Sequence, residues 1–348
     1  MRVVAAPARR NRDRNPFNFL LSEALAAEGC EVDDFDDRDG LLTNADILHI
    51  HWPQEAARGR RRRALVKTVN LLLPLLAQRL KGTRIVWTVH NVRGHDQNNA
   101  GLEKILMRVV ARLVHGVIFL TESSRDPAYA EIPALAAKPF AVIPHGLYGS
   151  RSERTRDQAR ALFGLPVGTP VIGFLGDIKR YKGLDLLLDA FAETPPGEIT
   201  LFIAGEFPSP SYRAEVENRL AGLRTGGHAV VFHEKRLDTQ ALIDAIRSCN
   251  VVALPYRTAW NSGLALLVLE NGVRILTSDA PVFRDLQHEV GREWVETYDG
   301  NPTGKVLMSA AADAAGEGDM CKCGFSEARS WTRIGAETLA FYRRLGAR

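Results

Sequence analysis

The chain has 348 residues, of which 45% are hydrophobic and 25% are charged, and its net charge at pH 7 is +4. This length is enough for two domains that each bury their own core, and the composition is that of an ordinary soluble globular protein. No apolar run reaches the ~20 residues needed to span a bilayer, and the N-terminus lacks the pattern of a secretory signal. Four scattered cysteines fit a reducing cytoplasm.

Short β-rich runs alternate with helical patterns along both halves of the chain. In the first half we predict strands at 3–6, 31–35, 47–50, 84–89, 116–120 and 140–143, with helices at 17–27, 64–80 and 102–113. In the second half we predict strands at 171–175, 199–204, 230–232, 251–255 and 275–277, with helices at 184–192, 212–223, 264–271 and 331–345. Regular β–α alternation predicts parallel, doubly wound sheets.

A polar stretch without a strand pattern, 148–169, separates the two halves and is interpreted as the domain junction. We therefore expect a first domain at 1–150 and a second at 151–330. The remaining residues, 331–348, are expected to form a helix that packs back on the first domain.

Two segments of the second half have the pattern of a phosphate site. Gly173–Gly183 and Asn261–Gly272 each follow a buried strand and lead through small residues into an apolar helix. A helix N-terminus with bare N–H groups and a nearby lysine suits a diphosphate. Lys182 is the first candidate, with Lys179 and Arg180 beside it, and Ser262 and Gly263 offer backbone donors. The alternatives are a solvated loop lysine and a plain helix N-cap at Asn261–Gly263.

A basic cluster precedes the apolar helix of the first half. Its members are Arg58, Arg60, Arg61, Arg62, Arg63 and Lys67. Cations at a helix N-terminus oppose the helix dipole, whereas a basic start on a leucine-rich helix is typical of an interfacial, non-spanning membrane helix. We therefore favour membrane docking through Arg60–Arg63 and the apolar residues around Leu72. Core packing alone and nucleic-acid binding remain alternatives, although no aromatic residues alternate with the arginines.

Motifs along the whole chain carry a resemblance to a known family. They are Asn15-Pro-Phe17, Ile47–Pro53, Thr88–Asn91 with His95-Asp96, His145–Tyr148, Tyr181–Gly183, Leu254–Tyr256, Asn261–Gly263 and Glu289–Trp294. These resemble the GT-B nucleotide-sugar glycosyltransferases, in particular the bacterial GDP-mannose:glycolipid β-mannosyltransferases of xanthan-type exopolysaccharide assembly. The resemblance implies two Rossmann-like domains facing a central cleft, the first holding the acceptor and the second the nucleotide sugar. It also implies a monotopic membrane protein that acts on polyprenyl-diphosphate oligosaccharides.

The chain departs from the wider retaining family of this fold at two places. That family has a Gly-Arg-x5-Lys pattern in which Gly176 and Lys182 match here, but Asp177 stands at the arginine position. Lys179 or Arg180 is expected to supply the missing charge. The family's pair of glutamates falls at Trp260 and Val268, and Glu270 is out of register. The loss argues against retention and is compatible with the inverting, β-forming relatives.

An inverting transfer needs a general base in the first domain. Asp96 is our preferred base, because a loop carboxylate reaches a bound acceptor, and His90 is the alternative. Acceptor contacts are expected from His51, Asn15 and Trp52. Donor contacts are expected from Gly176, His145, Tyr256 and Asn261, beside the residues named above. For His51, His90 and Asp96 a purely structural role stays open.

No metal site is expected. The run Asp33–Asp39 contains Asp-x-Asp spacings but is interpreted as a solvated loop, and Cys321-Lys-Cys323 has no second ligand pair nearby. We expect a cytoplasmic glycosyltransferase, attached peripherally to the inner face of the plasma membrane, that moves mannose from GDP-mannose onto a glycolipid without a cofactor or nucleic-acid partner. The alternatives are a retaining GT-B transferase with another nucleotide sugar, a nucleotide-sugar epimerase and a non-catalytic glycan-binding relative.

Overall fold

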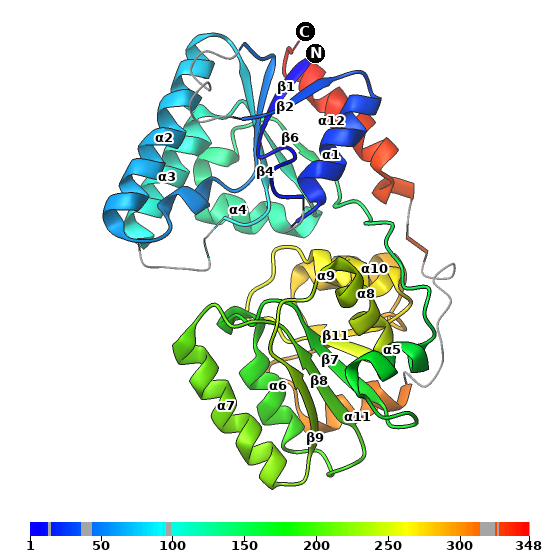
Figure 1. Cartoon of the computed structure of the whole chain (residues 1–348). Coiled ribbons are helices and arrows are strands. Elements are labelled where there is room, and N and C mark those ends of the chain that lie inside the picture. The colour runs from blue at the N-terminus through cyan, green and yellow to red at the C-terminus, as the bar shows by residue number, and fades with distance from the viewer. Residues whose placement is uncertain are drawn as a thin grey trace. The chain divides into compact units, whose positions relative to one another are not determined.

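The computed structural model describes residues 1–12, 15–35, 44–92, 94, 99–313, 324–325 and 327–347. The chain divides into two compact units (Figure 1). Unit 1 consists of Met1–Gly146 and Ser326–Arg348, and unit 2 consists of Leu147–Phe325. The first boundary therefore lies four residues before the expected one at 150, and unit 2 ends five residues before the expected limit of 330.

Unit 1 is a six-stranded parallel sheet in the order β2-β1-β3-β4-β5-β6. Its strands are β1 (Arg2–Ala6), β2 (Glu31–Asp34), β3 (Ile47–Ile50), β4 (Arg84–Val89), β5 (Gly116–Phe119) and β6 (Phe140–Val142). Its helices are α1 (Phe17–Ala27), α2 (Arg61–Leu80), α3 (Ala100–Leu113), α4 (Arg125–Glu131) and α12 (Trp331–Arg344), with a 3-10 turn η1 (Pro53–Ala57). In Figure 1, α1 and α12 lie on one face of this sheet and α2 and α3 on the other.

Unit 2 is a second six-stranded parallel sheet, in the order β12-β11-β10-β7-β8-β9. Its strands are β7 (Val171–Leu175), β8 (Thr200–Ala204), β9 (Ala229–His233), β10 (Val251–Leu254), β11 (Arg274–Ser278) and β12 (Val295–Tyr298). Its helices are α5 (Arg156–Phe163), α6 (Leu184–Phe191), α7 (Pro210–Thr225), α8 (Thr239–Ser248), α9 (Gly263–Glu270), α10 (Pro281–Val290) and α11 (Gly304–Asp313). A 3-10 turn, η4 (Arg180–Lys182), precedes α6.

The sequence predictions do not include α4, α8, α10 and α11, and two further elements also differ from them. The supposed junction at 148–169 contains α5, which starts with a capping box in which Thr155 and Gln158 satisfy each other's backbone N–H groups. The sixth strand of unit 2, β12, was not predicted. Its end residues, Val295 and Tyr298, are buried, whereas Glu296 and Thr297 between them are half-buried. β12 therefore lacks the continuous apolar run of a strand in the middle of a parallel sheet.

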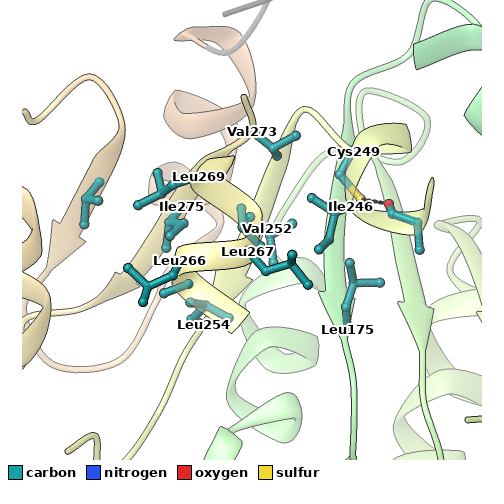
Figure 2. Close-up of a cluster of buried hydrophobic side chains, with 14 of the residues drawn as sticks. Leu175, Ile246, Cys249, Val252, Leu254, Leu266, Leu267, Leu269, Val273 and Ile275 are labelled. Atoms are coloured by element: carbon teal, nitrogen blue, oxygen red, sulfur yellow. Dashed lines mark hydrogen bonds between the residues drawn. The ribbon is translucent and has the colours of Figure 1, made fainter. Parts of the chain in front are cut away.

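Each sheet is covered on its faces by apolar side chains. In unit 1, Phe17 and Leu21 of α1 pack with Phe341 and Tyr342 of α12 in one cluster, so the C-terminal helix belongs to the core of this unit. In unit 2, one cluster lies under α5, α8, α9 and α10 and a second under α6, α7 and α11. Figure 2 shows the first of these, where α9 packs its leucines over β10 and β11.

The lengths and compositions of the helices show whether any of them could cross a membrane. Within the described ranges, no helix is both long and apolar enough to cross a bilayer.

Candidate functional site

The carboxyl ends of β7 and β10, which pair in the sheet of unit 2, carry the two predicted phosphate motifs. The loop after β7 starts at Gly176, whose φ of +88° is in the left-handed region that favours glycine. Ile178 is fully buried and fixes the loop to the core. At its end, Gly183 also has a positive φ, +72°, and a Cβ there would lie 2.1 Å from the carbonyl oxygen of Pro255. Only glycine allows the two loops to pack this closely.

Among the described residues, Lys179 and Arg180 of this loop form ion pairs, whereas Lys182 forms none. Its Nζ lies 3.5 Å from the position that a Cβ on Gly176 would occupy, so the ammonium group rests over the start of the loop. The pKa of Lys182 is lowered to about 8, mainly by burial, which the charge of Asp177 partly opposes and the charge of Lys179 assists. Lys182 is thus charged at neutral pH but poised to lose its proton just above it.

The other two predicted cations are engaged with carboxylates. Lys179 Nζ lies 3.1 Å from the Asp177 carboxylate. Burial alone would raise the pKa of Asp177, but the charge and hydrogen bond of Lys179 outweigh it, and the pKa falls below its usual value. Arg180 pairs with Glu215 of α7 and stacks over the Tyr212 ring at 4.6 Å. Neither residue therefore supplies an uncompensated charge in place of the missing family arginine.

Arg257 locks the two loops together, a role that the sequence reasoning missed. Its guanidinium donates to both oxygens of Asp185, at 2.9 and 2.6 Å, and to the carbonyl of Arg180 at 2.8 Å. Its backbone N–H donates to the carbonyl of Tyr181 at 2.8 Å. Asp185 also accepts from the Tyr212 hydroxyl at 2.7 Å. This network fixes the backbone on either side of Lys182.

The second motif forms the start of α9. Ser262 is its N-cap and accepts from the N–H of Ala265 at 3.2 Å. The Ser262 side chain also hydrogen-bonds with Tyr256, a contact that offsets part of the increase in the Tyr256 pKa caused by burial. The Tyr256 ring lies 6.0 Å from that of Tyr181. The N-cap role and the proposed donor role are compatible, because the cap uses one N–H of the first turn and leaves others.

One end of the unit 2 sheet therefore combines a lysine near its titration point, a glycine-bounded loop and two helix starts. Such a combination binds a diphosphate through backbone N–H groups and one cationic side chain. It also stabilises negative charge that develops on a departing diphosphate.

Glu270 has a structural position that the sequence did not reveal. It is buried, and its two carboxylate oxygens accept from the N–H groups of Tyr148 and Gly149 at 2.9 and 2.8 Å. The neighbouring Asn271 accepts from the N–H of Ser152 at 2.9 Å. The end of α9 therefore holds the first residues of unit 2, and Glu270 is committed to that task.

In unit 1, four buried histidines gather at the carboxyl ends of β3, β4 and β6. A hydrogen bond of 3.2 Å joins His51 Nδ1 and His90 Nε2, and the Trp52 ring stacks on His90 at 4.3 Å. Phe17 lies edge-on to His90 at 5.0 Å and 4.7 Å from His145. The predicted acceptor residues His51 and Trp52 and the alternative base His90 are thus one cluster.

The fourth histidine, His49, holds α12 against the sheet. Its Nδ1 is 2.6 Å from the Tyr342 hydroxyl and its Nε2 is 2.7 Å from the Thr88 hydroxyl. Burial lowers the pKa of His49 to about 3, and that of His145 to about 4. Burial and the neighbouring histidines lower the pKa values of His51 and His90 well below 6.5. All four rings are neutral at pH 7 and act as hydrogen-bonding groups.

Two other predicted residues, His145 and Asn15, have local contacts. His145 Nδ1 lies 2.7 Å from the carbonyl of Gly146, and the His145 carbonyl accepts from Arg329 at 2.9 Å. Asn15 accepts from the N–H of Phe17 at 3.2 Å and so supports the start of α1. Asp96 lies outside the described residues.

Helix α2 presents an apolar stripe that the described residues of unit 1 leave exposed. Its exposed large apolar residues are Leu65, Val66, Val69, Leu73, Leu76 and Leu80, with Leu72 half-buried beside them. Spacings of three and four residues place them on one face, while Ala64, Thr68, Leu75 and Gln78 face the core. Arg61–Arg63 are exposed in the first turn, and the helix contains no acidic residue.

Among the described residues, no group of three or more histidine, cysteine, aspartate or glutamate side chains is arranged to hold a metal ion. Asp33 pairs with Arg2, and Asp34 accepts from the N–H groups of Ala8 and Arg9. The acidic run thus begins with structural contacts, while its later members, with Cys321 and Cys323, lie outside the described residues.

One comparison with known proteins matches part of the chain and another matches nearly all of it. Residues 169–299, most of unit 2, match the family model described as "Glycosyl transferases group 1". The whole chain is similar to a GDP-mannose:glycolipid 4-beta-D-mannosyltransferase of Xanthomonas campestris, with 28% identity over 96% of this chain and 89% of the relative.

The solved structures that are similar share the two-domain GT-B fold. Starch synthase IV of Arabidopsis thaliana, bound to ADP and acarbose, has a TM-score of 0.69 at 12% identity and covers 100% of this chain and 99% of its own. Sucrose-phosphate synthase of Thermosynechococcus elongatus has a TM-score of 0.67 at 17% identity, with 99% of each chain covered. At such identities the likeness concerns the fold, and it agrees with two parallel, Rossmann-like sheets.

Proposed function

The chain is a glycosyltransferase with a group 1 domain at residues 169–299, and we propose that it transfers mannose from GDP-mannose, with inversion, onto a lipid-linked glycan. The observation that carries the proposal is the packing of the Gly176–Gly183 loop against Pro255 and Arg257 of the loop that leads from β10 to α9, with Lys182 over Gly176. GDP-mannose is chosen because the similar enzyme of Xanthomonas campestris is named for that donor and for a glycolipid acceptor.

The donor diphosphate is assigned to this end of unit 2. Lys182 supplies the charge that stabilises the leaving GDP, and the N–H groups of Ser262 and Gly263 supply further donors. Lys179 and Arg180 contribute less, because Asp177 and Glu215 already compensate their charges.

Asp96 is the proposed general base. Asp96 is preferred because a loop carboxylate can reach a bound acceptor. His90 is buried, hydrogen-bonds with His51 and stacks with Trp52. His90 and His51 are therefore assigned to hydrogen bonds with the acceptor or the sugar.

Inversion is proposed because the Asn261–Gly272 motif lacks the pair of glutamates found in the retaining family. Trp260 and Val268 stand where retaining relatives have glutamates, and the nearby Glu270 is held by Tyr148 and Gly149. No carboxylate of α9 is thereby left for the donor sugar.

Peripheral attachment to the inner face of the plasma membrane is proposed from α2. The exposed leucine and valine stripe gains free energy on entering the acyl boundary, and each arginine near an anionic surface adds about 1 kcal/mol. A helix without acidic residues meets no repulsion there.

A panel of nucleotide sugars tests the donor. GDP-mannose is expected to raise the Tm of the purified protein more than UDP- or ADP-sugars do, and turnover should follow when a membrane lipid extract is added. A clear preference for a uridine nucleotide would displace the GDP assignment. Loss of stabilisation in Lys182→Ala would tie the response to the proposed site.

Vesicle sedimentation tests the membrane surface. Replacing Arg60–Arg63 with serine, or Leu73 and Leu76 with serine, is expected to lower binding to anionic vesicles more than tenfold. Leu162→Ser is the matched control, because Leu162 is an exposed leucine of α5 in unit 2. Unchanged vesicle binding in both test variants would refute docking through α2.

A further inference from the structure

Arg257 engages the two peptide units that lead into Lys182. Its guanidinium donates to the carbonyl of Arg180 at 2.8 Å, and its backbone N–H donates to the carbonyl of Tyr181 at 2.8 Å. Each bond fixes the orientation of its peptide unit, because a carbonyl accepts near its lone-pair directions. Arg257 thus determines the direction in which the chain enters Lys182. It also engages two oxygen atoms whose partial negative charge would oppose an anion in this loop.

Asp185, in the first turn of α6, holds Arg257 in place. It is 5% exposed, and its two carboxylate oxygens accept from the Arg257 guanidinium at 2.9 and 2.6 Å. Its backbone N–H donates to the hydroxyl of Tyr212 at 3.3 Å, and that hydroxyl donates to the carboxylate at 2.7 Å. Burial acts to raise the pKa of Asp185, but the hydrogen bonds from Arg257 and Tyr212 outweigh it, and the pKa lies below its usual value. The pair of Asp185 and Arg257 therefore stays ionised at neutral and alkaline pH.

This pair acts on Lys182 through the backbone. Asp185 compensates the charge of Arg257, and its hydrogen bond raises the pKa of the guanidinium. The charges that shift the pKa of Lys182 are those of Asp177 and Lys179, beside the larger effect of burial. Two parallel hydrogen bonds from a guanidinium to a carboxylate fix geometry more tightly than a single contact does. What the pair supplies to Lys182 is therefore position.

We propose that Asp185 and Arg257 are positioning residues that keep the Lys182 ammonium group over Gly176 without touching the donor themselves. The consequence for catalysis rests on the proposed function, in which that ammonium group stabilises the leaving diphosphate. A misplacement of about 1 Å in such a group costs about 10²-fold in rate. Transfer is thereby made to depend on an ion pair that lies outside the predicted phosphate-binding residues.

The titration of Lys182 in the free protein tests the inference without any nucleotide sugar. Competitive labelling with acetic anhydride, read by mass spectrometry across the pH range, gives the pKa of this one lysine. A displaced loop exposes Lys182 to water, so Arg257→Gln and Asp185→Asn are both expected to move its pKa from about 8 toward 10.5. Loss of charge alone would move it in opposite directions, because removing a cation raises the pKa of a lysine and removing an anion lowers it.

Turnover gives a second readout, as initial rates of transfer or donor hydrolysis. Arg257→Gln is expected to lower kcat about 10²-fold, while the Kd for GDP-mannose, measured by calorimetry, changes less than kcat. The double variant with Asp185→Asn should lose no more than either single variant, because the two side chains act as one unit. Arg257→Lys should recover only a small part of kcat, since an ammonium group cannot reproduce the fork.

Arg219→Gln is the matched control. Arg219 joins α7 to Asp189 of α6 through an ion pair at 2.9 Å that is more exposed than the pair of Asp185 and Arg257. Its loss should leave both the titration of Lys182 and kcat unchanged. Should Arg257→Gln fail to fold, Arg257→Lys is expected to move the pKa of Lys182 upward by a smaller amount.

Three results would overturn the inference. They are an unchanged titration of Lys182 in both variants, a lower pKa of Lys182 in Asp185→Asn, and full kcat in Asp185→Asn beside a loss in Arg257→Gln. In the last case Arg257 would act on the donor directly. Because the labelling uses no donor, it decides the positioning role even if GDP-mannose fails to raise the Tm of the wild-type protein, which would count against the proposed function alone.

Discussion

Lys182 offers the sharpest test of the proposed donor site, because burial gives its pKa a value of about 8 within an accessible pH range. If the charged ammonium binds the diphosphate, kcat/KM for the donor falls as the free enzyme loses this proton. With a pKa of about 8, the charged fraction falls from about 0.9 at pH 7 to about 0.1 at pH 9. We therefore expect an alkaline decrease in kcat/KM of about tenfold over these two pH units.

Unfolding does not explain such a decrease. The pKa of Lys182 is lower in the folded chain than in the unfolded chain, so the unfolded chain holds more protons above pH 8. The contribution of this lysine to the free energy of unfolding therefore rises with pH in that range.

The assay is initial-rate transfer or donor hydrolysis from pH 6 to pH 9.5 with three variants. Lys182→Ala is expected to lower kcat about 10²–10³-fold, as does loss of one donor to a developing anion. Lys182→Arg keeps the charge at every pH, so its profile should lack the alkaline decrease. Lys179→Ala is the matched control, because its charge is already paired with Asp177, and it should cost less than tenfold. An alkaline decrease that survives in Lys182→Arg would refute the reasoning.

Three further changes test other parts of the molecule. Asp96→Asn is expected to lower transfer at least 10²-fold while GDP-mannose still raises the Tm; retained turnover would remove Asp96 from the base role. Glu270→Ala leaves the N–H groups of Tyr148 and Gly149 without their acceptor and should lower the free energy of unfolding by about 2 kcal/mol, seen as a lower Tm. Tyr342→Phe breaks the hydrogen bond to buried His49 and should cost about 1 kcal/mol in a urea melt, and equal stability would contradict that role.

Continuous apolar runs made several strands predictable from the sequence. Val171–Leu175 was predicted to the residue, because a continuous apolar run bounded by proline and glycine has few other solutions. β12 was not predicted because two adjacent polar residues, Glu296 and Thr297, interrupt its four-residue run. Helix α5 was not predicted because arginines between its apolar positions obscure the helical pattern. Thr155 and Gln158 nevertheless carry the capping-box signal of a helix start.

The parts of the candidate site that the sequence predicts are those whose residues are close together in the chain. The loop from Gly176 to Gly183 could be recognised from its glycines and lysines alone. The clamp by Arg257 on Asp185 joins residues 72 positions apart, and the bond between His49 and Tyr342 joins residues 293 positions apart. Local propensity carries no information about such pairs, since tertiary packing creates them.

Asp177 changes the charge at the proposed donor site. The retaining family that this chain resembles has arginine and lysine at the positions of Asp177 and Lys182, and so two positive charges. Here Lys179 and Lys182 together with Asp177 leave a net charge of one, and the ion pair between Asp177 and Lys179 localises that charge on Lys182. Asp177 also raises the pKa of Lys182 against the effect of burial. An acidic residue at the arginine position thus reduces the total charge but helps the remaining ammonium group to stay protonated at neutral pH.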